Sequence, residues 1–455
     1  ARMNDVKLHV LRSDGGLASS ASAAEYPVSL LMSGPAGGVA GAVWIAKQSG
    51  YMNVLTIDMG GTSTDVALVQ DGEAQIRRET TVGDVTVRAS SIDVRTVGAG
   101  GGSIAHVPEL TGALRVGPQS AGADPGPAAY GHGGTEPTVT DANMVLGYLP
   151  QSALLGGDMR LERAAAVKAV QRVADAMKLS LNKAAAGIVD IVNENMFGAL
   201  RLVSIERGYD PRDFALMAFG GAGPLHANAL GRLMGSWPVI IPPGPGVLCA
   251  SGDATTRVRD EASRTFIRRF GDTSATEVVK ILNGLAETAA GSLDLENVPR
   301  ADQTITHQVD LRYHGQGLLL TVDTDVATLA ASGLDAIGDP FDEMHKQLFT
   351  FALDVDKEVV NLRAVVQGKA TVVKREKLAQ GDADSEVPVL ARQSVFMDGD
   401  TYEANIYDRA KLKSGNRIEG PAIITEMDST SVILVGHAGV IDDFGNIIIR
   451  PLSGA

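Results

Sequence analysis

The sequence predicts an α/β protein, and three observations support this prediction. Short apolar runs rich in β-branched residues, such as 54–57 and 66–69, have the composition of buried strands. Residues 161–206 instead repeat their apolar positions with the period of amphipathic helices. After residue 272, and above all after 393, strand-like runs alternate with turns, which predicts a mostly β (α+β) carboxyl-terminal domain.

Composition excludes several classes of protein. The 455 residues are enough for two or three domains of ~100–200 residues each. A net charge of −14 argues against nucleic acid or an anionic membrane as the main partner. The single Cys249 excludes an internal disulfide and a cysteine-based zinc site. No apolar run is long enough to span a membrane and the first residues do not resemble a signal peptide, so we expect a cytoplasmic location.

The stretch 54–69 contains the strongest candidate site. Two predicted strands flank Asp58-Met-Gly-Gly-Thr-Ser-Thr-Asp65. Adjacent glycines allow a tight turn whose N–H groups can hold an anion, and hydroxyl side chains add donors. An acid beside a bound phosphate usually holds a hydrated Mg²⁺, which is the role we expect for Asp58. An ordinary Gly-Gly hairpin with a polar tip remains an equal alternative at this point.

Three further segments have unusual composition. A glycine loop at 98–105 suggests that something approaches its backbone, although neither a P-loop nor a Rossmann pattern is present. Residues 117–143 form a long Gly/Pro-rich segment. The predicted strand 214–219 leads into a glycine turn and a helix containing His226, for which we favour a structural role.

In the preceding helix, Asn193 is expected on a solvated face. The glycines at 34–41 are expected to allow close helix packing rather than anion binding.

Motifs along nearly the whole chain resemble the hydantoinase A/5-oxoprolinase/acetone carboxylase family. The matching runs are SDGG at 13–16, SGPAGG at 33–38, DMGGTSTDV at 58–66, GAGGGSIA at 98–105, SAGADPGP at 120–127, GGTEPTVTDAN at 133–143, FGGAGPLHA at 219–227, LRYHGQ at 311–316 and GPAIITE at 420–426. More broadly, a phosphate hairpin and a later Gly-Gly-Ala turn resemble the second lobe of actin-like ATPases, the fold shared with sugar kinases and heat-shock chaperones.

The resemblance implies a division of the chain and a nucleotide site. Residues 1–50 would close the first lobe, 51–271 would form the nucleotide-binding lobe with a Gly/Pro-rich insertion, and 272–455 the carboxyl-terminal domain. ATP and Mg²⁺ are the implied cofactors, with Asp58 as the metal-binding residue. The residues implied to bind nucleotide are Gly60, Gly61, Thr62, Ser63 and Thr64 at the phosphates, and Gly220, Gly221 and Ala222 at the adenosine.

Two features depart from the family pattern. Family members usually have an additional amino-terminal domain with its own D-x-G-G-T-F-T-D motif, whereas Asp58 begins the only D-x-G-G-T here. We therefore expect a partial subunit, or a partner chain that supplies this half, together with a non-homologous subunit. The position before Tyr130, often cysteine in the family, is Ala129, which excludes a thiol nucleophile there.

The resemblance further implies ATP-driven activation of a small cyclic amide or ketone through phosphorylation of its oxygen. The candidate catalytic residues are Asp58, Asp65, Asp124, Asp141 and His132. For Asp65 we favour orientation of the hairpin over contact with the metal; His106 and His314 are weaker candidates. Three functions remain open: a subunit of a hydantoinase- or oxoprolinase-type hydrolase, a subunit of an acetone- or acetophenone-type carboxylase, and a structural subunit without turnover.

Overall fold

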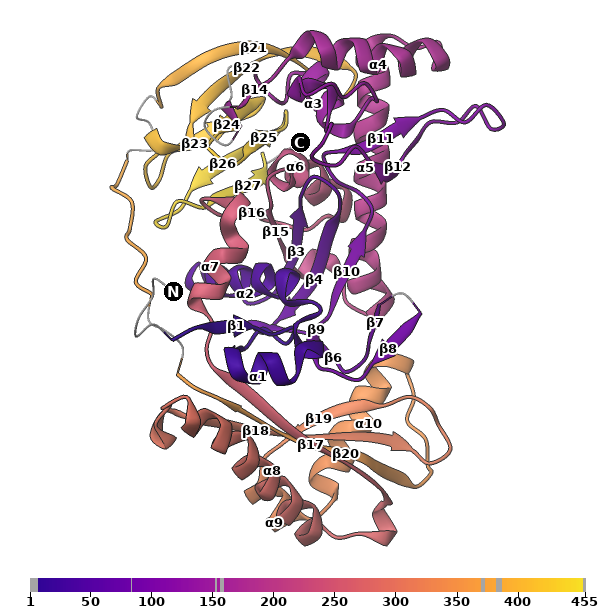
Figure 1. Cartoon of the computed structure of the whole chain (residues 1–455), viewed down its shortest axis with the longest axis vertical. Helices are drawn as coiled ribbons and strands as arrows, with labels where there is room; N and C mark the ends of the chain where they lie inside the picture. Colours follow the sequence, from indigo (N-terminus) through magenta and orange to yellow (C-terminus); the bar gives the residue numbers. More distant parts are fainter. Residues whose placement is uncertain are drawn as a thin grey trace. The chain divides into compact units, whose positions relative to one another are not determined.

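The computed structural model describes residues 7–82, 84–151, 154–155, 159–369, 373–381 and 387–452. The chain forms two compact units, each built from two separate segments. The first unit comprises residues 1–33 and 254–372, and the second comprises 34–253 and 373–455. Both contain helices and sheets (Figure 1), so the predicted α/β class is confirmed.

The first unit is centred on an antiparallel sheet with strand order β17-β20-β18-β19. These strands are Arg259–Arg269, Lys357–Gln367, Thr304–Tyr313 and Leu320–Thr324. Helices α8 (Ala275–Leu295), α9 (Val326–Ser332) and α10 (Asp335–Phe349) share its core. The amino-terminal segment contributes β1 (His9–Leu11), β2 (Leu17–Ser19) and α1 (Ser20–Glu25). Short 3₁₀ turns lie at Pro27–Leu30, Phe270–Asp272 and Arg300–Asp302.

Helix α10 was not expected from the sequence. Gly338 and Pro340 lie inside it, and both residue types count against a helix interior. The helix forms because Ile337, Phe341 and His345, spaced four residues apart, are all buried on one face. Tertiary packing therefore outweighs the local preference.

The second unit is built on a mixed sheet whose main path is β10-β4-β3-β15-β16-β27-β26-β23, with β5 added beside β4. In that order the strands are Val94–Val97, Thr64–Gln70, Val54–Met59, Ala215–Phe219, Val239–Ile241, Ile447–Pro451, His437–Ile441 and Arg417–Glu419, with β5 at Glu73–Ala74. Strands β3, β15 and β16 run parallel to one another. The first two are almost completely buried, as their mostly apolar sequences predict.

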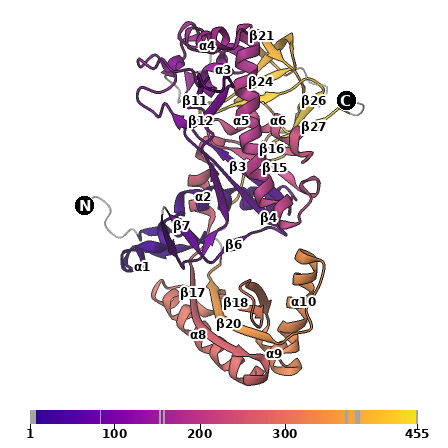
Figure 2. The same cartoon turned by 90° about the vertical axis from the view of Figure 1, so that its right-hand side faces the viewer.

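Helices and smaller sheets surround this main sheet. The helices are α2 (Ser33–Gln48), α3 (Val139–Leu146), α4 (Arg163–Met177), α5 (Leu181–Val203), α6 (Gly223–Met234) and α7 (Leu248–Thr255). A second sheet contains β21 (Val389–Met397), β22 (Asp400–Asp408), β24 (Ala422–Thr425) and β25 (Thr430–Ile433). Helix α5 contacts β4 and β10 and also α6, and it runs along the length of this unit in Figure 2.

The remaining elements of the second unit are short. Strand pairs are β6 (Ile76–Arg77) with β9 (Ser91–Ile92), β7 (Thr80–Val82) with β8 (Val85–Val87), β11 (Ser103–His106) with β12 (Arg115–Ser120), and β13 (Leu154–Leu155) with β14 (Met159–Arg160). The 3₁₀ turns are η2 (Ala128–Tyr130), η3 (Ile205–Arg207), η4 (Pro211–Asp213), η5 (Pro245–Val247) and η8 (Arg409–Lys411).

The two units do not follow the predicted boundaries at 50/51 and 271/272. The cause is the last strand of the chain: β27 pairs with β16, placing Ile448 opposite Ile240. Residues 373–455 thereby complete the sheet that begins at residue 54, and Ile447 and Ile449 join its core. Figure 1 shows these yellow carboxyl-terminal strands beside the pink strands β15 and β16.

None of the helices in the described ranges has the length and apolarity that a membrane span requires.

Candidate functional site

The hairpin of β3 and β4 places two carboxylates directly opposite each other. Asp58 pairs with Asp65 across the two strands, and the turn between the strands runs from Gly60 to Ser63. Directly opposed residues of an antiparallel pair point to the same face of the sheet, so these side chains are neighbours. Opposed like charges destabilise a hairpin, and a bound cation would relieve their repulsion.

Asp58 is enclosed by three other elements. The Cys249 thiol of α7 donates to Asp58 Oδ2 at 3.3 Å. A Cβ atom on Gly38 of α2 would lie 3.3 Å from the same oxygen, and one on Gly220 would overlap Oδ1. Burial raises the pKa of Asp58, the Cys249 hydrogen bond lowers it, and the charge of Asp65 raises it further. The carboxylate is therefore held in one place and is poorly neutralised by the chain itself.

The side chain of Asp65 is fixed from the neighbouring strand. Thr96 of β10 donates its hydroxyl to Asp65 Oδ1 at 2.5 Å. Burial raises the pKa of Asp65, and this hydrogen bond opposes the effect. The contact ties Asp65 to β10, which supports a role in orienting the hairpin, although the second carboxylate oxygen remains available to a ligand shell.

The turn itself is open on its outer side. The N–H of Gly60 donates to the Ser63 carbonyl at 3.1 Å and closes the turn. This N–H therefore points into the turn, whereas the predicted contact with phosphate requires it to point outward. Gly61 and Thr62 are exposed, and a Cβ on Gly61 would meet nothing within 4 Å. Within the described part of the chain, the Gly61 and Thr62 N–H groups make no hydrogen bond. These two donors and the hydroxyls of Thr62 and Ser63 are suited to an anion.

Thr64, in contrast, faces the interior. It is buried, and its hydroxyl donates to the Ala99 carbonyl at 2.5 Å. Its predicted contact with phosphate is therefore replaced by a bond that holds the hairpin to the glycine loop behind it.

The glycine loop packs against the back of the turn. Gly101 N–H donates to the Gly60 carbonyl at 3.0 Å and Gly102 N–H to the Gly61 carbonyl at 2.6 Å. A Cβ on Gly100 would lie 2.6 Å from the backbone of Gly61 and Thr62. The close approach predicted for this loop is thus made by the hairpin's own backbone, so these glycines serve as a support for the turn.

The second glycine turn lies beside the base of the hairpin. Ala222 N–H donates to the Met59 carbonyl at 3.0 Å. Gly220 has φ +79°, which favours glycine, whereas Gly221 is exposed and has φ outside this region. A Cβ on Gly221 would make only an ordinary contact, 3.7 Å from the Asp428 carbonyl. Room for a ligand therefore exists at Gly221 and not at Gly220.

Two loops that the sequence does not assign to the site border this turn. Gly220 N–H donates to the Pro245 carbonyl at 2.9 Å, and the Ser429 hydroxyl donates to the Gly221 carbonyl at 3.3 Å. Asp428 in turn accepts from Gly246 N–H at 2.9 Å. The GPAIITE motif, which ends at Glu426, was the only sequence signal near the second loop.

A buried ion pair joins these two loops. Arg409 Nη1 lies 2.7 Å from Glu426 Oε1, and the guanidinium also donates to the carbonyls of Ile241 and Gly445 at 2.8 Å. Glu426 Oε2 accepts from Gly244 N–H at 3.1 Å. Arg409 and Glu426 therefore hold the two loops in fixed positions relative to each other. Truncating either residue would leave the charge of the other one buried and unpaired, which is strongly destabilising.

The Gly/Pro-rich segment contributes a capping network and exposed loops. Asp141 is fully buried; its carboxylate accepts from the N–H of Ala129 at 2.7 Å and of Thr138 at 2.9 Å, within the capping box of α3. Burial raises its pKa and these bonds oppose the rise. This geometry is that of a positioning residue.

Asp124 and His132 are both exposed on loops of the same segment. Asp124 follows Ala121, whose N–H donates to the Gly102 carbonyl at 2.8 Å, so its loop adjoins the support of the hairpin. His132 lies on the turn after η2, where a Cβ on Gly131 would meet Glu162. The structure thus brings together the hairpin and the 220–222 turn, with Asp124 one loop away and His132 on a different turn.

His226 and His314 have structural partners. His226 is buried between α5 and α3: its Nδ1 lies 2.8 Å from Asn193 Oδ1 and its Nε2 lies 3.2 Å from Asn143 Nδ2. Burial lowers its pKa to about 4, so it is neutral at pH 7. The expected solvated position of Asn193 is wrong, because this residue is buried. In the first unit, His314 Nδ1 lies 2.6 Å from Glu358 Oε1.

The predicted close packing of the α2 glycines is also confirmed. A Cβ on Gly41 would lie 2.7 Å from the Leu248 carbonyl, and one on Gly252 would lie 2.6 Å from Gly41 N. Helices α2 and α7 therefore approach closely, which places Cys249 beside Asp58.

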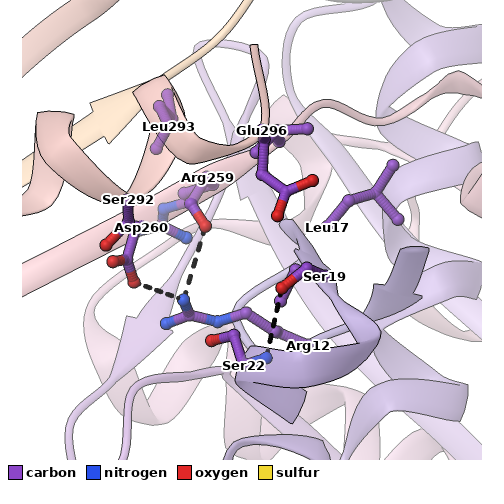
Figure 3. A pocket seen from close by; sticks show the side chains of 11 residues that line it. Arg12, Leu17, Ser19, Ser22, Arg259, Asp260, Ser292, Leu293 and Glu296 are labelled. Atoms are coloured by element: carbon purple, nitrogen blue, oxygen red, sulfur yellow. Dashed lines mark hydrogen bonds and ion pairs between the residues drawn. The ribbon is translucent and has the colours of Figure 1, made fainter. Parts of the chain in front are cut away.

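A pocket in the first unit contains none of the predicted site residues. Figure 3 shows Arg12 reaching across it to the Arg259 carbonyl at 3.3 Å and to Asp260 Oδ1 at 2.7 Å, with Glu296 on the opposite wall. Because the guanidinium is already paired, we interpret this cluster as a tie between the amino-terminal segment and β17.

The paired acids and the open turn fit Mg²⁺ and a phosphate group. Mg²⁺ is usually bound by one or two carboxylates together with water and phosphate oxygens, rather than by an all-protein cage. The described residues contain no cluster of three or more His, Cys, Asp or Glu side chains arranged to hold a metal.

Comparisons with known proteins identify relatives over nearly the whole chain. The caprolactamase subunit alpha of Pseudomonas jessenii is 38% identical over 97% of this chain and 64% of its own length. The crystal structure of the ATP-dependent caprolactamase from that organism matches with a TM-score of 0.86 at 34% identity, covering 97% of this chain and 65% of that one. A nucleotide-free acetone carboxylase structure matches with a TM-score of 0.79 at 26% identity, covering 98% and 64%.

This chain therefore spans about two thirds of the length of these relatives. The hydantoinase/oxoprolinase family model matches residues 1–262, and that of the hydantoinase/oxoprolinase C-terminal domain matches residues 271–449. The predicted family is confirmed: the chain belongs to the hydantoinase/oxoprolinase family.

Proposed function

We propose that this chain is the part of an ATP-dependent enzyme that binds Mg²⁺ and nucleotide phosphate, and that the complete enzyme opens a cyclic amide. The opposed pair of Asp58 and Asp65 beside the open Gly61–Thr62 turn is the main observation in its favour. The similarity to a caprolactamase subunit supports the hydrolase reading. We also propose a cytoplasmic location.

In this proposal each group has a distinct role. Asp58 would hold Mg²⁺, and the Gly61 and Thr62 N–H groups would hold phosphate oxygens. Gly221 and Ala222 border the adenosine, while Gly220 shapes the turn. When bound, Mg²⁺ supplies neutralisation of phosphate charge during transfer to the substrate oxygen.

The remaining predicted residues either position other parts of the site or are candidates for contact with substrate. Asp65 and Thr64 orient the hairpin, and Asp141 positions the Gly/Pro-rich segment by capping α3. Asp124, next to the hairpin support, is the best-placed candidate for contact with substrate; His132 is the weaker one.

The second candidate function is a subunit of an acetone- or acetophenone-type carboxylase, favoured by the structural match to acetone carboxylase. The third, a structural subunit without turnover, would apply if a partner made all contacts with nucleotide. In each case we propose an amino-terminal partner half with the first phosphate motif and a non-homologous subunit, because one wall of a cleft cannot exclude water from the transferred phosphoryl group.

A substrate screen on the complete assembly tests these functions. ATP hydrolysis would be measured with hydantoins, 5-oxoproline and small ketones, each with and without bicarbonate. The hydrolase proposal predicts stimulation by a cyclic amide without bicarbonate; stimulation only by a ketone with bicarbonate would contradict it. The verified single chain should show no substrate-stimulated turnover at the ordinary rate of about 1 s⁻¹ or more.

A further inference from the structure

Three arginines from three different elements converge on the buried Asp93 in the second unit. Arg77 belongs to β6, Arg95 to β10, and Arg207 ends η3. Arg207 Nη2 forms an ion pair with Asp93 Oδ2, while Arg77 Nη1 and Arg95 Nε lie 3.8 Å and 3.9 Å from Oδ1. We call these four residues the Asp93 cluster.

The backbone around the cluster holds it in place. The Asp93 N–H donates to the Gln75 carbonyl at 2.8 Å, and β6 pairs with β9 so that Arg77 lies opposite Ser91. Arg77 Nε also donates to Ser91 Oγ at 3.2 Å, which fixes the direction of its guanidinium. Figure 1 shows β6 and β9 as neighbours in this part of the chain.

The cluster has an excess of positive charge. Among the described residues, Asp93 is the only carboxylate within ion-pair distance of these three guanidiniums, so the local sum is two positive charges in a chain whose net charge is −14. The pKa of Arg77 is lowered by burial; Asp93 opposes this, and the like charges of Arg95 and Arg207 add to it. An anion placed among the guanidiniums would relieve this repulsion.

The carboxylate is inaccessible, whereas the guanidiniums reach solvent. The exposed fraction of the Asp93 side chain is 3%, against 22% for Arg77, 49% for Arg95 and 32% for Arg207. In the part of the chain that the structure describes, Asp93 Oδ1 is buried without a hydrogen-bond partner, since Arg77 and Arg95 approach it only at ion-pair distance. Hydrogen-bond donors of these two arginines are therefore still available for an outside acceptor.

We propose that the Asp93 cluster binds a dianionic oxyanion, namely a phosphate group. Arginine forks match the oxygens of phosphate in paired hydrogen bonds, and two excess positive charges complement a dianion. Asp93 is the buried ion-pair partner that the three guanidiniums share, and it holds them close together in the absence of ligand. This site is separate from the β3–β4 turn and does not depend on the nucleotide proposal.

Thermal unfolding of the chain in phosphate tests this site. Phosphate at ten times its dissociation constant should raise the melting temperature of the wild-type chain by about 2 °C over chloride at equal ionic strength. Arg95→Gln, at the most exposed and most loosely paired position, should unfold normally in chloride and lose most of this rise. Arg95→Lys keeps the charge without the fork and should retain part of it.

Arg417→Gln is the matched control, because Arg417 is a partly exposed arginine of β23 in the same unit, paired with Glu419. It removes the same charge and should keep the full phosphate effect. Stabilisation by free phosphate and by a phosphomonoester such as glycerol 2-phosphate is compared. The comparison distinguishes a site for the free ion from a site for a phosphate group carried by a larger molecule. Equal stabilisation by phosphate and chloride, or a full phosphate effect in Arg95→Gln, would overturn the proposal.

Discussion

The two adjacent glycines of the 220–222 turn should respond very differently to a side chain. Gly220 has φ +79°, a region that costs other residues about 1–2 kcal/mol, and its Cβ would lie 2.5 Å from the Met59 carbonyl. Overpacking of a filled site adds about 1–3 kcal/mol. Gly220→Ala should therefore destabilise the chain by ~2–5 kcal/mol, which lowers the melting temperature by at least about 3 °C.

Gly221 should tolerate the same change. Its Cβ would make only an ordinary contact at 3.7 Å, so Gly221→Ala should change the free energy of unfolding by less than about 0.5 kcal/mol. If the adenosine packs there, Gly221→Val should weaken ATP binding more than it lowers the melting temperature. Calorimetric unfolding and ATP titration, performed on both variants, measure the two effects separately.

The opposite pattern would refute this reasoning. Equal loss of stability in Gly220→Ala and Gly221→Ala would mean that the chain itself, rather than a ligand, fills the space at Gly221. Normal ATP affinity in a stable Gly221→Val chain would mean that the nucleotide does not approach this turn.

Two further substitutions test how the site is supported. Thr64→Val should cost ~1–3 kcal/mol in urea unfolding, because the buried Ala99 carbonyl loses its donor; a neutral effect would show that the hydroxyl does not hold the hairpin to the glycine loop. The pKa of His226 is lowered to about 4 by burial, so the unfolded chain binds its proton more readily and stability should fall as the pH drops from 6.5 to about 4, by up to ~3 kcal/mol. His226→Gln should remove this part of the pH dependence, and an unchanged profile would contradict a buried neutral histidine.

The sequence was sufficient to predict the hairpin. The apolar runs 54–57 and 66–69 flank a short polar Gly-Gly turn. Local rules therefore determine both strands and the pairing of Asp58 with Asp65 across them. The strand–turn–helix around Gly220 was predictable for the same reason.

The surroundings of Asp58 were not predictable, because they depend on contacts across long stretches of chain. Cys249 lies 191 residues from Asp58 in sequence, and no local pattern links them. The Ser429 hydroxyl and the Gly221 carbonyl, which are hydrogen-bonded, likewise lie 208 residues apart in sequence. The purpose of the glycines at 100–102 was misread, since a sequence does not show which backbone approaches them.

Burial also determined which polar residues were misjudged. The sequence predicts a catalytic role for Asp141 and a solvated position for Asn193, yet both side chains are buried and hydrogen-bonded to neighbouring groups. The hydrogen-bond partners, not the residue types, decide between a positioning and a catalytic role.

Titration of Mg-ATP into the wild-type chain and Asp58→Asn, alone and in the complete assembly, tests the proposed site most directly. Asp175→Asn, at an exposed acid of α4, serves as the control for loss of charge. We predict that Asp58→Asn folds normally and lowers Mg²⁺-dependent ATP affinity by about tenfold or more, while the control leaves it unchanged. Unchanged Mg-ATP affinity and turnover in the assembly with Asp58→Asn would contradict the assignment of the β3–β4 hairpin as the phosphate and metal site.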